Sequence, residues 1–433
     1  MPLELDSGAK EFAAAFAKFL AAKRELAADV DAAAAAIVED VRSRGDEALI
    51  AQTKRLDKLD LTPATLRVTD AEIDAAVKQC DPTALAALRF AKARIEDYHK
   101  KQLPADLDYS DASGVKLGWR YRAISAVGLY VPGGTAAYPS SVLMNAVPAK
   151  VAGVTRLVMV VPSPGGVLNP LVLAAAQIAG ISEIYRVGGA QAIAALAYGT
   201  ATITPVDKIT GPGNAYVAAA KRRVFGAVGI DMIAGPSEVL VIADRNNDPQ
   251  WIAADLLAQA EHDTAAQSIL ITDDGGFASA VREAVTRQLT QLPRATIAAA
   301  SWQDHGAVIL VKDLAEAPAL ADRIAAEHVE LAVDQPEALA ARITHAGAIF
   351  LGRHTPEAVG DYVAGPNHVL PTARSARFAS GLGVLDFMKR TSLLRCDAAS
   401  LKAIGPAAIA LAEAEGLDAH ARSVSLRLNL GGG

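Results

Sequence analysis

The run Arg156-Leu-Val-Met-Val-Val161 decides the fold class of this chain. A short apolar run of this kind is typical of a strand that is buried on both faces of a sheet. A helical stretch is expected next, at 170–179, with proline in its first turn, and a second strand at 183–187. Because short apolar strands that alternate with helices form βαβ units, this region predicts a parallel sheet.

The same alternation extends on both sides of this run and then begins again. The first series has expected strands at 115–130, 156–161, 183–187 and 207–210, and helices at 141–152, 170–179, 191–198 and 214–225. The second series has expected strands at 239–243, 268–272, 307–311, 329–333 and 348–351, and helices at 249–262, 276–290, 318–327 and 336–345. The chain is therefore predicted to be an α/β protein with two tandem, incomplete Rossmann-like domains, each with a parallel sheet.

A helical N-terminal segment and a small tail domain complete the predicted organisation. The expected units are a helical N-terminal segment (1–27), an α/β domain built from two segments (28–131 and 237–381), an inserted Rossmann-like domain (132–236) and a small tail domain (382–433). Within the tail, 401–415 should be helical up to a stop at Gly416. The alternating pattern at 424–428 predicts an edge strand.

Composition narrows the class of protein. The chain has 433 residues, of which 52% are hydrophobic and 21% charged, which is typical of a globular protein with more than one core. A net charge of −6 argues against a nucleic-acid surface. Two cysteines, Cys80 and Cys396, provide no disulfide framework. The N-terminus lacks the pattern of a signal peptide, and no uninterrupted apolar run of membrane-spanning length is present, so a cytoplasmic location is expected.

The stretch Asp255-Leu-Leu-Ala-Gln-Ala-Glu-His-Asp263 carries the first candidate site. On a helix, Asp255, Gln259 and His262 would lie along one face, offering a carboxylate, an amide oxygen and an imidazole. Such a set can begin a metal site, and the remaining ligands would come from 360–362 or 416–420. Nitrogen and oxygen ligands suit zinc, cobalt or manganese. A solvated helix edge is the alternative interpretation.

Two strand–glycine–helix junctions, at 187–192 and 209–216, predict anion or nucleotide binding. Glycine allows a ligand to approach the backbone closely, and the following helix N-terminus attracts negative charge. Neither junction has the G-x-G-x-x-G pattern, because Tyr216 occupies the third position after Gly211 and Gly213. Tight turns without a ligand remain the alternative.

The adjacent pair Glu327-His328 lies where a helix is expected to give way to a strand. Histidine transfers protons near neutral pH and glutamate can activate water, so the pair is a candidate acid–base couple, although an exposed pair without a role is an alternative. His99 and His345 are expected to be solvated on helix surfaces, and His368 lies in a proline-containing loop. The chain has no G-x-S-x-G motif and no H-E-x-x-H motif.

Taken together, these stretches resemble one family, the histidinol dehydrogenases. The matching segments, in chain order, are 130–145, 188–197, 211–217, 230–238, 255–263, 326–331, 360–372 and 415–420. The resemblance covers the chain from about residue 120 to residue 428, and the first hundred residues add little to it. It implies a zinc- and NAD-dependent dehydrogenase that oxidises L-histidinol through L-histidinal to L-histidine, the last two steps of histidine biosynthesis.

The resemblance also implies roles for particular residues. The four zinc ligands would be Gln259, His262, Asp361 and His420. His328 would be the acid–base catalyst, and Glu327 would activate water. Further substrate contacts would be Ser237, His368 and Glu415. The NAD contacts would be Tyr130, Gln191 and Asn214. The family is an intertwined homodimer, so the tail at 382–433 would complete the partner's site. Neither cysteine falls in a motif, which leaves no cysteine nucleophile for the aldehyde step.

The chemistry implied by this resemblance is coherent. Oxidation of an alcohol to an acid removes two hydrides, so two NAD molecules act in turn, and the metal would orient the substrate through its imidazole and amine. Other hypotheses are a related dehydrogenase for a different small polar alcohol, a metal hydrolase with Glu327 as base, and a metal-stabilised binding protein. The hydrolase hypothesis leaves the two glycine-rich junctions unexplained.

Overall fold

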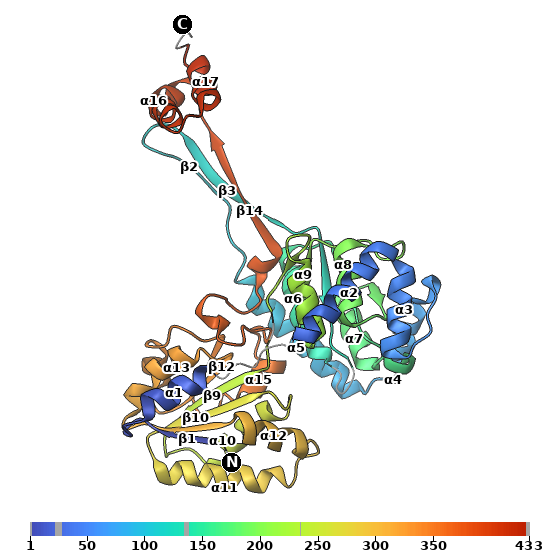
Figure 1. Cartoon of the computed structure of the whole chain (residues 1–433), viewed down its shortest axis with the longest axis vertical. Helices are drawn as coiled ribbons and strands as arrows, with labels where there is room; N and C mark the ends of the chain where they lie inside the picture. Colours follow the sequence, from blue (N-terminus) through green and yellow to red (C-terminus); the bar gives the residue numbers. More distant parts are fainter. Residues whose placement is uncertain (1, 22–27, 134–137, 234, 430–433) are drawn as a thin grey trace.

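The computed structural model describes residues 2–21, 28–133, 138–233 and 235–429. Residues 134–137 and 234, which belong to two of the motifs above, lie outside the described residues, as does 22–27. Figure 1 shows two α/β bodies side by side and a long arm that leaves them. The N-terminus lies on one body and the C-terminus at the tip of the arm. No helix in the described ranges is long and apolar enough to cross a membrane.

The first body contains a fully parallel five-stranded sheet. Its strands, in spatial order, are β6 (Glu183–Tyr185), β5 (Arg156–Val160), β4 (Ala126–Tyr130), β7 (Lys208–Thr210) and β8 (Gly229–Ile230). Its own helices are α6 (Pro139–Ala152), α7 (Pro170–Ala179), α8 (Gly189–Tyr198) and α9 (Ala215–Val224). The first strand of the unit, β4, pairs with the fourth, β7. This order creates a switch point at the carboxyl ends of β4 and β7, where α/β folds bind ligands.

The second body repeats this plan with six parallel strands. They are β1 (Leu3–Asp6), β11 (Ala307–Leu310), β10 (Gln267–Thr272), β9 (Glu238–Ala243), β12 (His328–Ala332) and β13 (Ala348–Leu351). Its helices are α1 (Phe12–Ala21), α10 (Pro249–Ala260), α11 (Gly275–Leu289), α12 (Ala295–His305), α13 (Ala317–Ile324), α14 (Pro336–Ala340) and α15 (Glu357–Tyr362). The predicted pair of incomplete Rossmann-like units, with helical and tail additions, is confirmed.

The helices near the N-terminus do not pack where the sequence analysis placed them. They are α2 (Ala28–Arg44), α3 (Asp46–Asp57), α4 (Asp70–Gln79) and α5 (Pro82–Lys100). The helices α2 and α3 contact α8 and α9, while α4 and α5 contact α6 and α7. These helices and β4 therefore pack with the first body, whereas the sequence analysis grouped 28–131 with 237–381. An apolar helix face predicts that a helix packs, but not against which sheet.

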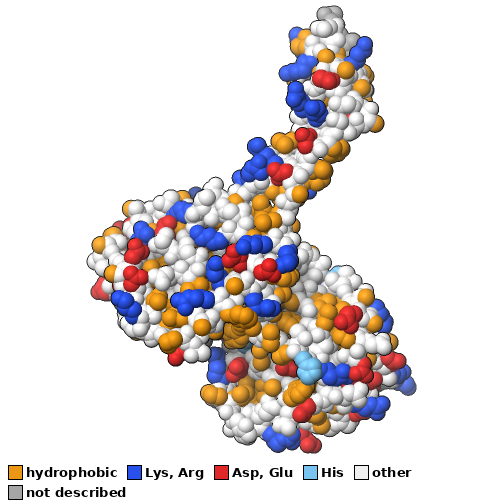
Figure 2. All heavy atoms as spheres, turned by 180° about the vertical axis from the view of Figure 1, so that it is seen from behind, with side chains coloured by type: hydrophobic (Ala, Val, Ile, Leu, Met, Phe, Trp, Pro, Cys, Tyr) orange, Lys and Arg blue, Asp and Glu red, His pale blue; other side chains and the backbone are white. Residues whose placement is uncertain are grey.

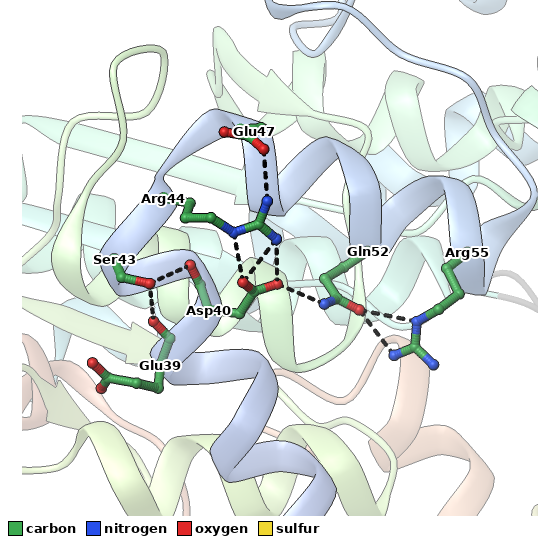
Figure 3. Close-up of polar contacts among 7 residues, drawn as sticks. All are labelled: Glu39, Asp40, Ser43, Arg44, Glu47, Gln52 and Arg55. Carbon is green, nitrogen blue, oxygen red and sulfur yellow. Dashed lines mark hydrogen bonds and ion pairs between the residues drawn. The ribbon is translucent and has the colours of Figure 1, made fainter.

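The corner between α2 and α3 is fixed by a polar network (Figure 3). Arg44 donates to both carboxylate oxygens of Asp40, at 2.8 and 3.0 Å, and Gln52 of α3 donates to Asp40 at 2.8 Å. Arg44 also donates to Glu47 at 2.7 Å. Gly45 occupies the joint with φ +59°, a conformation that glycine adopts without strain. The network keeps α2 and α3 together where they pack on α8 and α9.

The arm is made of segments far apart in the sequence. The strands β2 (Leu107–Ser110), β3 (Lys116–Ala123) and β14 (Met388–Arg395) form an antiparallel ribbon, which ends in α16 (Ala398–Ala414) and α17 (Asp418–Arg427). Seven of the eight residues of β14 are exposed. Short 3₁₀ turns occur at Pro63–Thr65, Pro164–Gly166, Leu314–Glu316, Ser375–Arg377 and Val384–Phe387.

Two local expectations are corrected by the structure. The edge strand predicted at 424–428 is wrong, because this segment belongs to the helical end of the chain. Val424 and Leu428, four residues apart, both face Gly405 of α16, so the alternation is equally a helical face. His99 is not solvated. It is fully buried in α5, where its Nδ1 lies 2.7 Å from the carbonyl oxygen of Ile95.

Candidate active site between the two bodies

The pair Glu327-His328 lies at the amino end of β12, where this strand runs beside β9. His328 is opposite Val239 in the register, and both Glu327 and His328 are buried. The backbone N–H of Glu238 donates to Glu327 Oε2 at 3.0 Å, and His328 Nδ1 lies 3.0 Å from the carbonyl oxygen of Glu238. The pair is therefore held by the backbone N–H and the backbone carbonyl of one residue of β9, Glu238.

The contact with Glu238 fixes the tautomer of His328. A carbonyl oxygen can only accept, so Nδ1 carries the hydrogen and Nε2 presents a lone pair. Nε2 is buried and has no hydrogen-bond partner among the described residues. Burial lowers the pKa of His328 to about 3, so its ring is neutral around neutral pH. A neutral imidazole with a free nitrogen can accept a proton from a substrate.

The Glu327 carboxyl lies 3.7 Å from His328 Nδ1. Burial raises the pKa of Glu327 well above its ordinary value, because a carboxylate loses water there. Hydrogen bonds from the Glu238 N–H and the Ser237 side chain act in the opposite direction, since they stabilise the charged form. Ser237, expected as a substrate contact, is thus placed next to Glu327. Once ionised, a carboxylate in such a site is a strong base.

Three of the four expected metal ligands gather next to this pair. Gln259 lies in the last turn of α10, and Asp361 comes from α15, which contacts α10. His262 follows α10, and its Nε2 lies 4.0 Å from Asp361 Oδ2. The Gln259 side chain is fully buried, yet both of its amide atoms lack a hydrogen-bond partner in the described part of the chain. A buried, unpaired amide is costly, so these donors fit a divalent cation.

His368 joins the same group. Its Nδ1 lies 3.1 Å from the backbone oxygen of Asp361 and 3.8 Å from the Asp361 carboxylate, and its Nε2 lies 3.4 Å from Ser141 Oγ of α6. Next to it, Asn367 donates to the carbonyl oxygen of Met144, also in α6. The loop at 365–372 therefore joins the site in the second body to a helix of the first. Figure 2 shows hydrophobic side chains gathered where the two bodies meet.

Sequence reasoning missed Glu357. It begins α15, where a glutamate at a helix N-terminus is usually solvated, but here it is buried with Oε1 3.5 Å from His328 Nδ1. Ligand atoms of His328, Glu357 and Asp361 lie within 4.8 Å of one another, so they form a second possible donor set. The side of His328 that faces Glu357 already bonds to Glu238, which favours the set of Gln259, His262 and Asp361.

A further pair of acids lies behind Glu357. Its backbone N–H donates to Glu330, whose carboxyl is hydrogen bonded to Asp255. Burial raises the pKa of both carboxyls, and so does their mutual repulsion in the case of Glu330. Asp255, which the helical spacing aligned with Gln259 and His262, thus turns to Glu330. It supports the wall of the site and does not join the expected metal donors.

The remaining expected ligand, His420, lies in α17 on the arm, together with Glu415 at the end of α16. Figure 1 shows these helices at the far end of the arm from α10 and α15. The two residues line a hollow with Leu411, Leu417 and Val424. Within one chain, the arm residues and the body residues do not meet.

The expected cofactor contacts surround the switch point of the first sheet. Tyr130 ends β4, and its hydroxyl accepts a hydrogen bond from the N–H of Gly189 at 3.1 Å. Gln191, in the first turn of α8, is buried, and its Oε1 has no hydrogen-bond partner within the ranges described. Asn214 caps α9 by accepting from the N–H groups of Tyr216 and Val217. These residues come from three different elements, the end of β4 and the starts of α8 and α9, but lie at one edge of one sheet, as residues of dinucleotide sites do.

The comparisons with known proteins decide the family. The family model described as histidinol dehydrogenase matches residues 20–428. The chain belongs to the histidinol dehydrogenase family. The histidinol dehydrogenase of Bradyrhizobium diazoefficiens is 68% identical over 99% of this chain and all of its own length. That of Rhodopseudomonas palustris is 67% identical over the same shares of both chains. The crystal structure of histidinol dehydrogenase from Elizabethkingia anophelis has 37% identity and a TM-score of 0.94, and the match covers 99% of this chain and 98% of that one.

Members of this family use NAD and zinc. The buried amides of Gln191 in the first body and Gln259 in the second, which have atoms without a partner among the described residues, agree with that requirement. The family match also covers most of the first hundred residues, which add little to the resemblance carried by the motifs. It extends through the arm, so the arm is a part of the histidinol dehydrogenase fold.

The two possible donor sets predict different effects of mutation on metal content. Asp361→Ala should lower metal content in either case, because both sets contain this residue. His262→Asn should also lower it, whereas Glu357→Gln should retain the metal, since losing a ligand opens the coordination shell and losing a neighbour does not. The measurement is elemental analysis of the purified, folded proteins. Loss of metal in Glu357→Gln, with normal content in His262→Asn, would favour the second set.

Proposed function

We propose that this protein catalyses the NAD-dependent, four-electron oxidation of L-histidinol through L-histidinal to L-histidine. The observation that carries the proposal is the buried couple of Glu327 and neutral His328 next to Gln259, His262 and Asp361, in a chain that matches histidinol dehydrogenases along its whole length. A cytoplasmic location is part of the same proposal. The substrate class follows from the family rather than from the pocket. Turnover of histidinol is therefore to be compared with turnover of a panel of other small polar alcohols.

His328 is proposed to serve both oxidation steps. Its Nε2 accepts the alcohol proton as the hydride leaves the carbinol carbon for the nicotinamide. The protonated ring gives this proton to the aldehyde oxygen as water attacks the carbonyl carbon, which restores the lone pair. The same nitrogen then accepts a proton from the hydrate as the second hydride leaves. The carbonyl oxygen of Glu238 keeps Nδ1 protonated throughout, so the lone pair stays directed into the site.

Glu327 is proposed to act between these two steps. It accepts a proton from the water that attacks the aldehyde carbon. The Glu238 N–H and Ser237 hold its carboxylate in position. When bound by Gln259, His262 and Asp361, the divalent metal supplies a template that orients the substrate's imidazole and amine. His368, fastened to the backbone of Asp361, would lie beside the bound substrate.

The cofactor is proposed to lie at the carboxyl edge of the first sheet, near Tyr130, Gln191 and Asn214. Support comes from the switch point between β4 and β7 and from the N-termini of α8 and α9, which attract a pyrophosphate. The His368 loop contacts α6 of this body, so the body that would bind the cofactor touches the expected metal site directly.

The arm is proposed to reach the site of a second subunit. His420 would supply the fourth metal ligand there, and Glu415 would contact the substrate's amine. Two features support the exchange: β14 is exposed along most of its length, and the arm presents large exposed hydrophobic side chains, Leu393, Leu394, Leu411, Leu417 and Leu426. Apolar surface of this extent on a thin projection is typical of an interface between subunits.

Replacing Glu327 should separate the two half-reactions. Glu327→Gln keeps the shape of the side chain but cannot take a proton from water, so oxidation of histidinal should slow by about 10²- to 10⁴-fold, and oxidation of histidinol to histidinal much less. His328→Ala should slow both. Each variant is given histidinol and, separately, histidinal, while NADH formation is followed by absorbance. Equal slowing of both steps in Glu327→Gln, with normal metal content, would show that Glu327 positions other groups and does not activate water.

Mixing two inactive variants should restore activity if sites are shared. In a mixed dimer of His420→Ala and His328→Ala chains, one site carries both lesions and the other carries neither. After subunit exchange, confirmed by mass spectrometry of tagged chains, activity should rise towards the fraction expected from one intact site per mixed dimer. His262→Asn mixed with His328→Ala is the matched control, because both lesions lie in the body and no intact site can form. Equal activity in the two mixtures would exclude a site built from two chains.

A further inference from the structure

A buried ion pair that no step of the proposed mechanism uses lies beside the cofactor edge. Lys221 of α9 and Asp231, which follows β8, are in direct contact, and their side chains are 3% and 1% exposed. Lys221 lies outside the matching segments, and Asp231 lies within the segment 230–238 but has no expected role. The pair belongs to the first body, at the crossover from β8 towards β9.

Both partners of this pair also bind the backbone of one residue, Gly211. Lys221 Nζ donates to the carbonyl oxygen of Gly211 at 3.1 Å, and Asp231 Oδ2 accepts from the N–H of Gly211 at 2.8 Å. Asp231 is itself held by its backbone N–H, which donates to Ile209 of β7 at 3.2 Å. The pair therefore closes around the first residue after β7 and satisfies its donor and its acceptor together.

Gly211 has little freedom in this position. Its φ is +114°, and a Cβ placed on it would lie 2.1 Å from the backbone oxygen of Tyr130. The turn from Gly211 leads within three residues to Asn214, the cap of α9. The direction of this turn determines the position of the N-terminus of α9 relative to the carboxyl end of β4. That place is the switch point at which the dinucleotide is proposed to bind.

A contribution to the free energy of folding does not by itself explain why an ion pair is buried at this position. Removing two charges from water costs several kcal/mol, so a buried ion pair is often no more stabilising than apolar side chains of similar size. What the apolar alternative cannot do is bind a backbone N–H and a backbone carbonyl in one fixed geometry. The pair's distinctive contribution is thus to the position of the Gly211 turn.

We propose that Lys221 and Asp231 are positioning residues for the cofactor, because they hold the Gly211 turn in the conformation that accepts the dinucleotide. This inference rests on the proposed function for the identity of the cofactor. The residues do not touch the reacting atoms. Loosening the turn should weaken NAD binding without changing the chemistry of His328 and Glu327.

Two double variants test this role without leaving a buried charge unpaired. In Lys221→Met with Asp231→Asn, the amide oxygen can still accept from Gly211, but the carbonyl of Gly211 loses its donor. In Lys221→Met with Asp231→Leu, both bonds are lost. The dissociation constant for NAD, measured by titration calorimetry without substrate, should rise in this order and reach on the order of tenfold or more in the second variant. At saturating NAD, kcat and the KM for histidinol should stay near wild type.

The matched control is Lys208→Met with Asp386→Asn. Lys208 begins β7, the strand that ends just before Gly211, and its Nζ lies 3.5 Å from the Asp386 carboxylate at the opposite edge of the sheet. This variant loses an ion pair of the same body but leaves the turn intact, so its NAD affinity should not change. Circular dichroism and thermal unfolding show which variants are folded. If the variant with Asp231→Leu does not fold, the NAD affinity of the variant with Asp231→Asn tests the inference.

Folded Lys221/Asp231 variants with NAD affinity within about twofold of wild type would overturn the inference. So would a wild-type protein that binds no NAD, or a rise of the same size in the Lys208/Asp386 control. Failure of the proposed function has a different signature: the wild type would bind NAD with the expected order among the variants but form no NADH from histidinol.

Discussion

The parallel pairing of β9 with β12 is the interaction on which the candidate active site depends. Its register puts His328 opposite Val239, so that the preceding residue of each strand, Glu327 and Glu238, meet at the amino edge of the sheet. The backbone of one residue, Glu238, then holds both catalytic candidates, through its N–H and its carbonyl oxygen. A shift of one residue would reverse the faces of the strand and send the imidazole to the other side. The tautomer and direction of His328 are thus a consequence of strand register.

The two bodies contribute opposite edges of similar sheets. The first offers the carboxyl ends of β4 and β7, where α/β folds usually bind nucleotides, and the second offers the amino ends of β9 and β12. The carboxyl edge of the second sheet carries a different arrangement, in which Arg353 bridges Asp244 and Asp334. Under the proposed function one edge would bind the cofactor and the other would carry the acid–base groups, so a substrate between the bodies could meet both. Asp231, which follows β8 at one edge, and Glu238, which begins β9 at the other, are close in the sequence.

The sequence predicted the parts of this arrangement that local pattern encodes. Apolar strands such as 156–161 and 239–243 are buried in any parallel sheet, so their positions were predictable, and so were Glu327 and His328 at a strand boundary. The docking of α2–α5 was not, because the apolar face of a helix does not identify its partner. Glu357 was missed because its burial depends on α15 lying against β12, a contact between segments that share no local signal. The helix at 418–427 was misread because a two-residue alternation and a four-residue repeat coincide over five residues.

The most direct test of the account is the number of NADH molecules formed for each histidinol consumed, counted by absorbance together with quantitation of histidinol, histidinal and histidine. We expect two NADH per histidinol, with histidine as the product, and loss of turnover after metal removal that added zinc restores. One NADH per histidinol with accumulation of histidinal would contradict the account, since Glu327 and His328 would then not support the second oxidation. Turnover that is unchanged after complete metal removal would contradict the role assigned to Gln259, His262 and Asp361.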